Sequence, residues 1–200
     1  MSFFNIEFKM NVPNALSFFR IALLPVFIIL YLNSSNHPQL LYWALGVLLL
    51  SGLTDSLDGI IARRFNQITD LGKLLDPVAD KLTQVTVVIC LALRYSEVVY
   101  LVVICLIKEF FQALGGIILL RRGEKIRSAR WFGKLSTFTF YGVMILIVGW
   151  PGMPRWLFIT LVIVVALLML FAFVNYIAVF FKMKKTFADR EVSASNTKSA

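Results

Sequence analysis

Four aspartates stand close together in a sequence that is otherwise strongly apolar: Asp55, Asp58, Asp76 and Asp80. The members of the first pair are three residues apart and those of the second pair four, so each pair falls on one face of a helix. Carboxylates at membrane depth are costly and are usually paired, solvated or engaged in coordination. Two such pairs facing each other offer the oxygen ligands that hard divalent cations such as Mg²⁺ prefer. The spacing therefore predicts a metal site, with a purely structural charge cluster as the alternative.

The elements that must position these aspartates are membrane helices. Hydrophobic residues make up 59% of the 200 residues, and the mean hydropathy is +0.81, far above the range of soluble proteins. Several apolar runs reach the roughly 20 residues that cross a bilayer. No stretch of useful length alternates with period two, which argues against a soluble α/β fold. The composition predicts an all-α integral membrane protein.

The apolar runs predict six transmembrane helices and a possible interfacial helix at the N-terminus. Residues 1–12 form the interfacial segment, residues 13–182 the six-helix domain, and residues 183–200 a polar C-terminal tail. Asn14 is a possible cap of the first helix. The expected helices span residues 14–33, 39–65, 72–95, 98–120, 131–149 and 156–181.

The two aspartate pairs lie on the second and third helices, which a short polar loop at residues 66–71 joins as antiparallel neighbours. The pairs therefore lie at the same depth and face each other. Arg20 is the one charge inside the first helix. Its side chain either reaches back to the headgroups or points at the aspartates.

The basic residues follow the helix ends. Of the 20 lysines and arginines, only Arg94 and Arg155 fall on the side opposite the termini, while Arg20, Lys81 and Lys108 lie within helices. The positive-inside rule then places both termini and the aspartates at the cytoplasmic face of the cell membrane. The net charge of +9 is explained by this pattern and by anionic lipid, and we expect no nucleic-acid partner.

Phosphoryl transfer is the chemistry that this set of residues suits. Carboxylate-bound cations can clamp a diphosphate and neutralise charge on its leaving group. Arg63, Lys134 and a basic loop at residues 121–134 lie at the same face, and one carboxylate could accept a proton from an attacking hydroxyl. Because the site opens at the level of the headgroups, the residues indicate a metal-dependent enzyme acting on a phospholipid.

The aspartates belong to a longer pattern, Asp55-x₂-Asp58-Gly59-x₂-Ala62-Arg63-x₈-Gly72-x₃-Asp76-x₃-Asp80. This pattern resembles the signature of the CDP-alcohol phosphatidyltransferase family. The resemblance implies CDP-diacylglycerol as donor, CMP as leaving group and an alcohol as acceptor. It further implies that the four aspartates bind two Mg²⁺ or Mn²⁺ ions, that Asp80 is also the catalytic base, and that the chain is a homodimer. Donor binding falls to Gly59, Ala62, Arg63 and Gly72.

The acceptor is indicated by three further segments, at residues 11–20, 74–81 and 131–137, which look like those of bacterial phosphatidylglycerophosphate synthases. Glycerol 3-phosphate is the acceptor of those enzymes, and Lys134, with Lys108 and Arg130, would hold it. Lys108 could instead neutralise the aspartates or pair with a charge elsewhere. Those enzymes usually carry a further arginine where Gly116 stands here. Cardiolipin synthases, which use phosphatidylglycerol, are the alternative resemblance, and a non-catalytic transporter or scaffold is a remote one.

Overall fold

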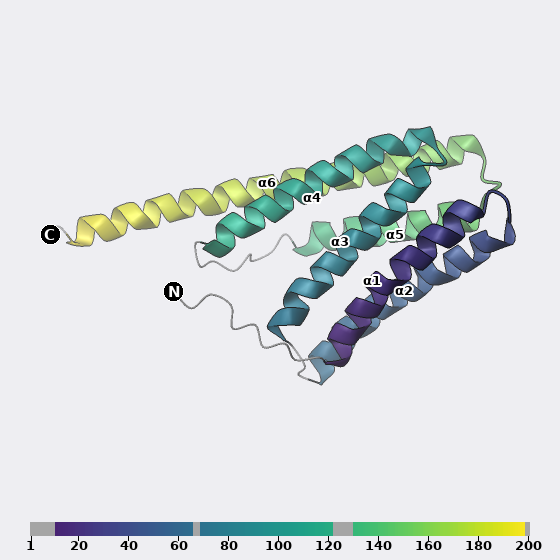
Figure 1. Cartoon of the computed structure of the whole chain (residues 1–200). Helices are drawn as coiled ribbons and strands as arrows, with labels where there is room; N and C mark the ends of the chain where they lie inside the picture. Colours follow the sequence, from purple (N-terminus) through teal and green to yellow (C-terminus); the bar gives the residue numbers. More distant parts are fainter. Residues whose placement is uncertain (1–10, 66–68, 122–129, 199–200) are drawn as a thin grey trace. The chain divides into compact units, whose positions relative to one another are not determined.

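The computed structural model describes residues 11–65, 69–121 and 130–198, and every regular element in these ranges is helical (Figure 1). This confirms the predicted all-α class. The elements are α1 (Val12–Asn33), α2 (Gln39–Arg64), α3 (Asp70–Ala92), the short 3₁₀ helix η1 (Ser96–Val98), α4 (Val99–Arg121), α5 (Arg130–Gly149) and α6 (Arg155–Lys198).

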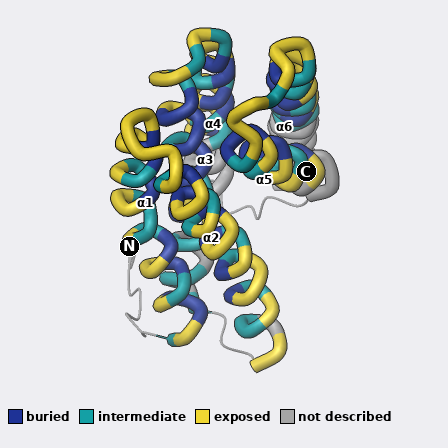
Figure 2. The backbone as a smooth tube through the Cα atoms, turned by 90° about the vertical axis from the view of Figure 1, so that its right-hand side faces the viewer, coloured by how far each residue is buried: buried dark blue, intermediate teal, exposed yellow. Residues whose placement is uncertain are grey.

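Three stretches in the described part of the chain are long and apolar enough to cross a bilayer: Val12–Asn33, Gln39–Ala62 and Arg155–Ala178. Buried and exposed residues alternate along the helices (Figure 2), and the exposed positions carry large apolar side chains such as Ile29, Leu53 and Leu167. Charged Arg20 and Asp58 are instead buried. Apolar surface outside and charge inside is the arrangement expected in lipid. The count of six spans stays a prediction.

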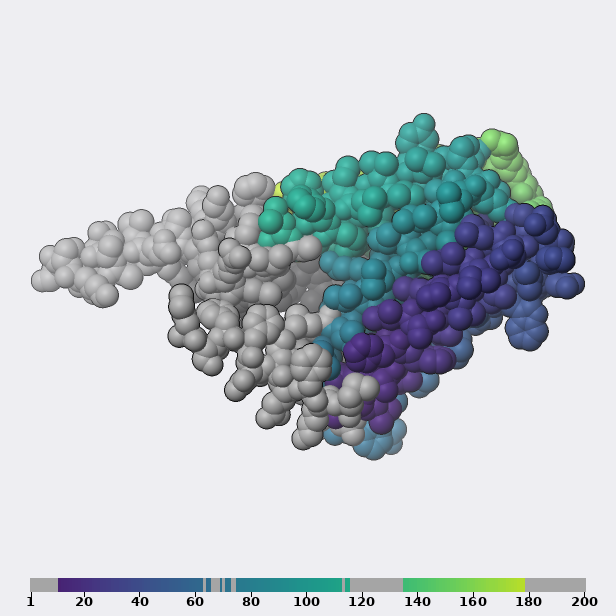
Figure 3. All heavy atoms as spheres, viewed as in Figure 1, coloured from purple at the N-terminus to yellow at the C-terminus, as the bar shows by residue number. Residues whose placement is uncertain are grey.

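The chain divides into two compact units. The first contains Met1–Val102 and Tyr141–Val162, and the second contains Val103–Phe140 and Ile163–Ala200. In the first unit α1 packs against both α2 and α3, and Figure 3 shows the side chains of α1 (purple) lying beside those of α3 (blue-green). In the second unit the rings of Phe111 and Phe173 are 5.7 Å apart, which packs α4 against α6. All four aspartates belong to the first unit.

The N-terminal ends of two helices differ from the predictions. Asn11 precedes α1 as its N-cap residue, without a side-chain hydrogen bond, so the prediction of Asn14 as a cap is wrong. Helix α3 begins at Asp70 because Thr69 caps it, its hydroxyl accepting a hydrogen bond of 3.0 Å from the backbone N–H of Gly72. Residues 1–10, most of the predicted interfacial segment, lie outside the described residues.

Helix α6 continues to Lys198 and does not end near residue 181 as predicted. The stretch from residue 182 to 198 contains neither glycine nor proline, the residues that most often stop a helix. It is rich in lysine, alanine and other good helix formers. Loss of apolar character marks the end of a membrane span, but it does not end a helix.

Candidate active site

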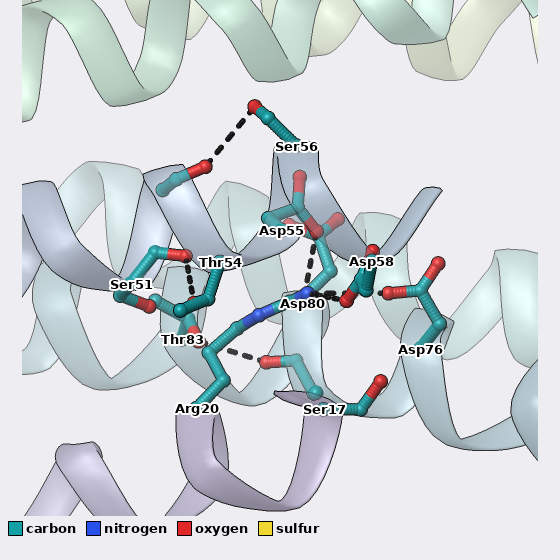
Figure 4. A network of polar contacts seen from close by, with 12 residues as sticks. Ser17, Arg20, Ser51, Thr54, Asp55, Ser56, Asp58, Asp76, Asp80 and Thr83 are labelled. Carbon is teal, nitrogen blue, oxygen red and sulfur yellow. Dashed lines mark hydrogen bonds and ion pairs between the residues drawn. The ribbon is translucent and has the colours of Figure 1, made fainter. Parts of the chain in front are cut away.

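Arg20 of α1 lies at the centre of the aspartates (Figure 4). Its Nη1 is 2.6 Å from Oδ1 of Asp55, and its Nη2 is 2.5 Å from Oδ2 of Asp58 and 3.4 Å from Oδ1 of Asp76. The residue is 0% exposed. Of the two orientations considered for Arg20, the one toward the site is correct, because α1 packs on both helices that carry the aspartates.

The three carboxylates differ in their access to a ligand. The side chain of Asp58 is only 4% exposed, whereas those of Asp55 and Asp76 are 40% and 48% exposed. Asp58 is therefore fixed from inside by the Arg20 guanidinium. Oxygens of Asp55 and Asp76 remain open to a ligand that approaches from outside.

These three aspartates fit a divalent cation. One oxygen from each lies within 4.8 Å of the others, and two oxygens bound to one Mg²⁺ can stand up to about 4.2 Å apart, so small side-chain movements suffice. Three carboxylates (−3) and Arg20 (+1) leave a formal charge of −2, which one divalent cation balances. The structure thus brings three of the four predicted ligands together, and metal binding by Asp55, Asp58 and Asp76 stays a prediction.

Asp80 has different partners. Its Oδ1 accepts a hydrogen bond of 2.9 Å from the hydroxyl of Tyr141, on α5, and its Oδ2 accepts one of 3.2 Å from the side-chain amide of Gln84. Asp80 is also close enough to Asp55 and Asp76 to interact with them electrostatically. These two neutral donors fix the orientation of the Asp80 carboxylate. The predicted roles of Asp80 as metal ligand and as catalytic base both stay predictions.

Gly72, predicted to bind the donor, has a packing role. A Cβ at this position would lie 2.6 Å from Oδ1 of Asn14 and 3.1 Å from Oγ1 of Thr69. Asn14 is fully buried, and its side-chain amide donates a hydrogen bond of 3.0 Å to the Thr69 hydroxyl. The start of α3 is thereby tied to the start of α1, which also carries Arg20. Donor binding by Gly72 stays a prediction.

Replacing Gly72 with alanine should destabilise the protein by about 1–3 kcal/mol, because the new methyl group overlaps a buried, hydrogen-bonded side chain. The matched control is Gly46→Ala in α2, where an added Cβ meets nothing within 4 Å. That change should leave the stability unchanged or raise it by about 0.5–1 kcal/mol. Thermal unfolding in detergent compares them. Equal melting temperatures for Gly72→Ala and the parent would contradict the packing role.

The structure says less about the other residues that were predicted to bind donor or acceptor. Gly59 and Ala62 follow Asp58 on α2 and are half-buried, as a surface for a bound nucleotide would require. The side chains of Arg63, Arg130 and Lys134 lie outside the described residues. The roles of these five residues in binding donor or acceptor stay predictions.

Lys108 is buried in the second unit, and its Nζ lies 2.8 Å from Oε1 of Glu109. Of the alternatives considered for Lys108, the structure shows an ion pair with a residue other than the aspartates. Glu109 is therefore the charged partner of Lys108 in this structure. Its role in binding the acceptor stays a prediction.

Sequence reasoning missed Tyr141 and Gln84, and it left the orientation of Arg20 open. Gln84 stands four residues after Asp80 and shares its helix face, so its spacing could have indicated the contact. Tyr141 is 61 residues from Asp80, and nothing in the local pattern distinguishes it from other tyrosines.

Known proteins similar to this chain include enzymes of phospholipid synthesis. A cardiolipin synthase (CMP-forming) of Streptomyces coelicolor is 40% identical over 130 residues, covering 64% of this chain and 60% of the relative. A putative cardiolipin synthase of Mycobacterium bovis is 35% identical over 142 residues, covering 71% and 63%. A CDP-diacylglycerol–glycerol-3-phosphate 3-phosphatidyltransferase of Rickettsia bellii is 44% identical over 88 residues, covering 44% and 47%.

The matches to these relatives thus span less than two thirds of each relative's own length. The family pattern itself extends much further along this sequence. Residues 10–182 match the CDP-alcohol phosphatidyltransferase family, which includes the stretch with the four aspartates and the helices that position it. The resemblance inferred from the aspartate spacing is therefore confirmed, and the chain belongs to the CDP-alcohol phosphatidyltransferase family.

Proposed function

We propose that this protein transfers the phosphatidyl group of CDP-diacylglycerol to the primary hydroxyl of a glycerol unit that carries a phosphate, and releases CMP. The observation that carries the proposal is the cluster of Asp55, Asp58 and Asp76 around buried Arg20, within a chain of this family. Glycerol 3-phosphate is the first candidate acceptor. Phosphatidylglycerol is the second.

In this proposal the acceptor hydroxyl oxygen attacks the lipid-linked phosphorus while the bond from that phosphorus to the CMP oxygen breaks. Asp80 takes the hydroxyl proton, with Tyr141 and Gln84 holding its carboxylate in place. Asp55, Asp58 and Asp76 would hold Mg²⁺ or Mn²⁺, which when bound supplies positive charge to the diphosphate. Arg20 acts through these aspartates, fixing their positions and offsetting their mutual repulsion.

The same proposal includes the residues that bind the substrates and the location of the protein. The donor's cytidine diphosphate would lie along Gly59, Ala62 and Arg63, and the acceptor phosphate would contact Lys134, with Arg130 and Lys108 as further candidates. Two cations, a homodimer, a cell-membrane location and a site facing the cytoplasm are supported by the family membership and by the distribution of basic residues.

Different observations favour the two acceptors. The segments at residues 11–20, 74–81 and 131–137 resemble enzymes that use glycerol 3-phosphate, and the R. bellii relative is named for that acceptor. Two observations favour phosphatidylglycerol. The cardiolipin synthases match over longer stretches than the R. bellii relative, and Gly116 stands where glycerol 3-phosphate enzymes usually carry an arginine. Both acceptors present the same nucleophile, a primary hydroxyl on a phosphoglycerol.

An acceptor panel tests the proposal. Purified full-length protein in mixed micelles with CDP-diacylglycerol and Mg²⁺ is given glycerol 3-phosphate, phosphatidylglycerol, inositol phosphate or serine, and CMP release is measured. Glycerol 3-phosphate should give the fastest release. Release with phosphatidylglycerol alone would assign the chain to cardiolipin synthesis. No CMP release above an Asp58→Asn control with any acceptor would overturn the proposed function.

A further inference from the structure

A cavity of about 360 Å³ lies in the first unit, at the turn between α3 and α4 and the turn between α5 and α6. Arg94 and Arg155 both line it. They are also the two basic residues that the predicted topology places on the side opposite the termini. Two exceptions to the positive-inside pattern, 61 positions apart in sequence, thus converge on one cavity.

This cavity is separate from the aspartate site. Asp80 is in α3 and Arg94 lies fourteen positions later, just beyond the end of that helix, which corresponds to roughly 20 Å at the rise of an α-helix. Exposed tyrosines and tryptophans collect at the same end of the unit, where α2, α4 and α6 begin and α5 ends, and such residues mark the headgroup level of a bilayer. They are Tyr42, Trp43, Tyr100, Trp150 and Trp156.

The guanidinium of Arg94 is held in place before any ligand binds. Its Nη1 donates a hydrogen bond of 3.1 Å to Oγ of buried Ser34, and its Cζ lies 6.0 Å from the ring centroids of Tyr31 and Tyr95. A guanidinium has five N–H donors in a planar fork that matches the oxygens of a phosphate. The contact with Ser34 does not exhaust these donors.

The remaining lining combines charge with apolar surface. Arg155 is exposed and forms an ion pair with Glu97, so the two arginines and one glutamate leave a formal charge of +1. Ile147, Met153 and Phe158 supply apolar wall. A single positive charge beside apolar side chains suits a singly charged phosphodiester that is attached to hydrocarbon.

We propose that this cavity binds the headgroup of an anionic phospholipid in the leaflet opposite the catalytic site. Arg94 contacts the phosphate and Arg155 provides a second positive charge. Phe158, Ile147 and Met153 pack against the glycerol backbone. The bound lipid bridges the α3–α4 turn and the α5–α6 turn and stabilises the fold.

A thermal-shift titration of the purified full-length protein in detergent tests the site. Phosphatidylglycerol should raise the melting temperature in a saturable way, and phosphatidylcholine, glycerol 3-phosphate and inorganic phosphate should raise it much less. Arg94→Gln should weaken the apparent affinity for phosphatidylglycerol roughly tenfold, because a charge-assisted bidentate contact is lost. Arg155→Gln, which leaves the contacts of Arg94 intact, tests the site again should Arg94→Gln fail to fold.

Two controls separate this site from other effects. Arg64→Gln removes the same charge from an exposed position at the far end of α2 and should keep the wild-type lipid affinity. The shift produced by CMP with Mg²⁺ should be equal in all variants, because it reports the aspartate site. An unchanged lipid affinity in both Arg94→Gln and Arg155→Gln, an equal loss in Arg64→Gln, or an equal response to phosphatidylcholine or free phosphate would overturn the proposal.

Discussion

Replacing Asp58 with asparagine is expected to lower the rate of phosphatidyl transfer roughly 100-fold or more, since a metal ligand is lost while the side-chain shape is kept. Asp58 is the most buried of the three clustered aspartates, and its carboxylate is 2.5 Å from Arg20. An amide in its place neither attracts a cation nor balances the guanidinium. Chelation of the wild type should abolish transfer, and Mg²⁺ or Mn²⁺ should restore it.

The matched control for this experiment is Ser56→Ala. Ser56 is exposed on the same helix turn, and its hydroxyl donates a hydrogen bond to the backbone carbonyl of Gly52. Loss of this hydroxyl should leave the transfer rate within about twofold of the wild-type rate, as for most surface changes. CMP release and direct Mn²⁺ binding are measured together. A loss of less than threefold in Asp58→Asn, or full activity after exhaustive chelation, would contradict the metal site.

The second large effect concerns Arg20, whose replacement by methionine should destabilise the protein by about 3–5 kcal/mol, the cost of breaking a buried ion pair by removing one partner. Methionine keeps a similar volume but leaves three carboxylates together without the guanidinium. For a chain of this size the loss corresponds to a fall in melting temperature of roughly 6–20 °C.

A divalent cation should restore more stability to Arg20→Met than it adds to the wild type, because it supplies positive charge at the same carboxylates. Arg20→Lys keeps the positive charge but lacks the planar fork that contacts several oxygens. Its melting temperature should therefore lie between those of Arg20→Met and the wild type. Arg64→Met, at an exposed arginine of α2, is the control for loss of charge alone. Unfolding is followed with EDTA and with Mg²⁺. If Arg20→Met and the wild type had the same melting temperature in EDTA, Arg20 would not stabilise the cluster of aspartates.

Much of the architecture followed from local pattern. Apolar runs of helical length predicted the all-α class and the order of the six helices, and the spacing of the four aspartates predicted both their helix faces and the family. Such features depend on residues within a few turns of one another. The helix ends were less predictable, as at Thr69, because a cap depends on one hydrogen bond to the backbone.

The sequence by itself determined that this chain is apolar and helical, and that carboxylates of two neighbouring helices meet at one level. It could not determine what lies between those carboxylates, because Arg20, Asp58 and Asp76 are far apart in sequence and meet only when α1 packs on both α2 and α3. The hydrogen bond from Tyr141 to Asp80 and the close approach of Gly72 to Asn14 likewise exist only in the packed state. Periodicity fixes which face of a helix a residue occupies, whereas the identity of its partner depends on how the helices pack.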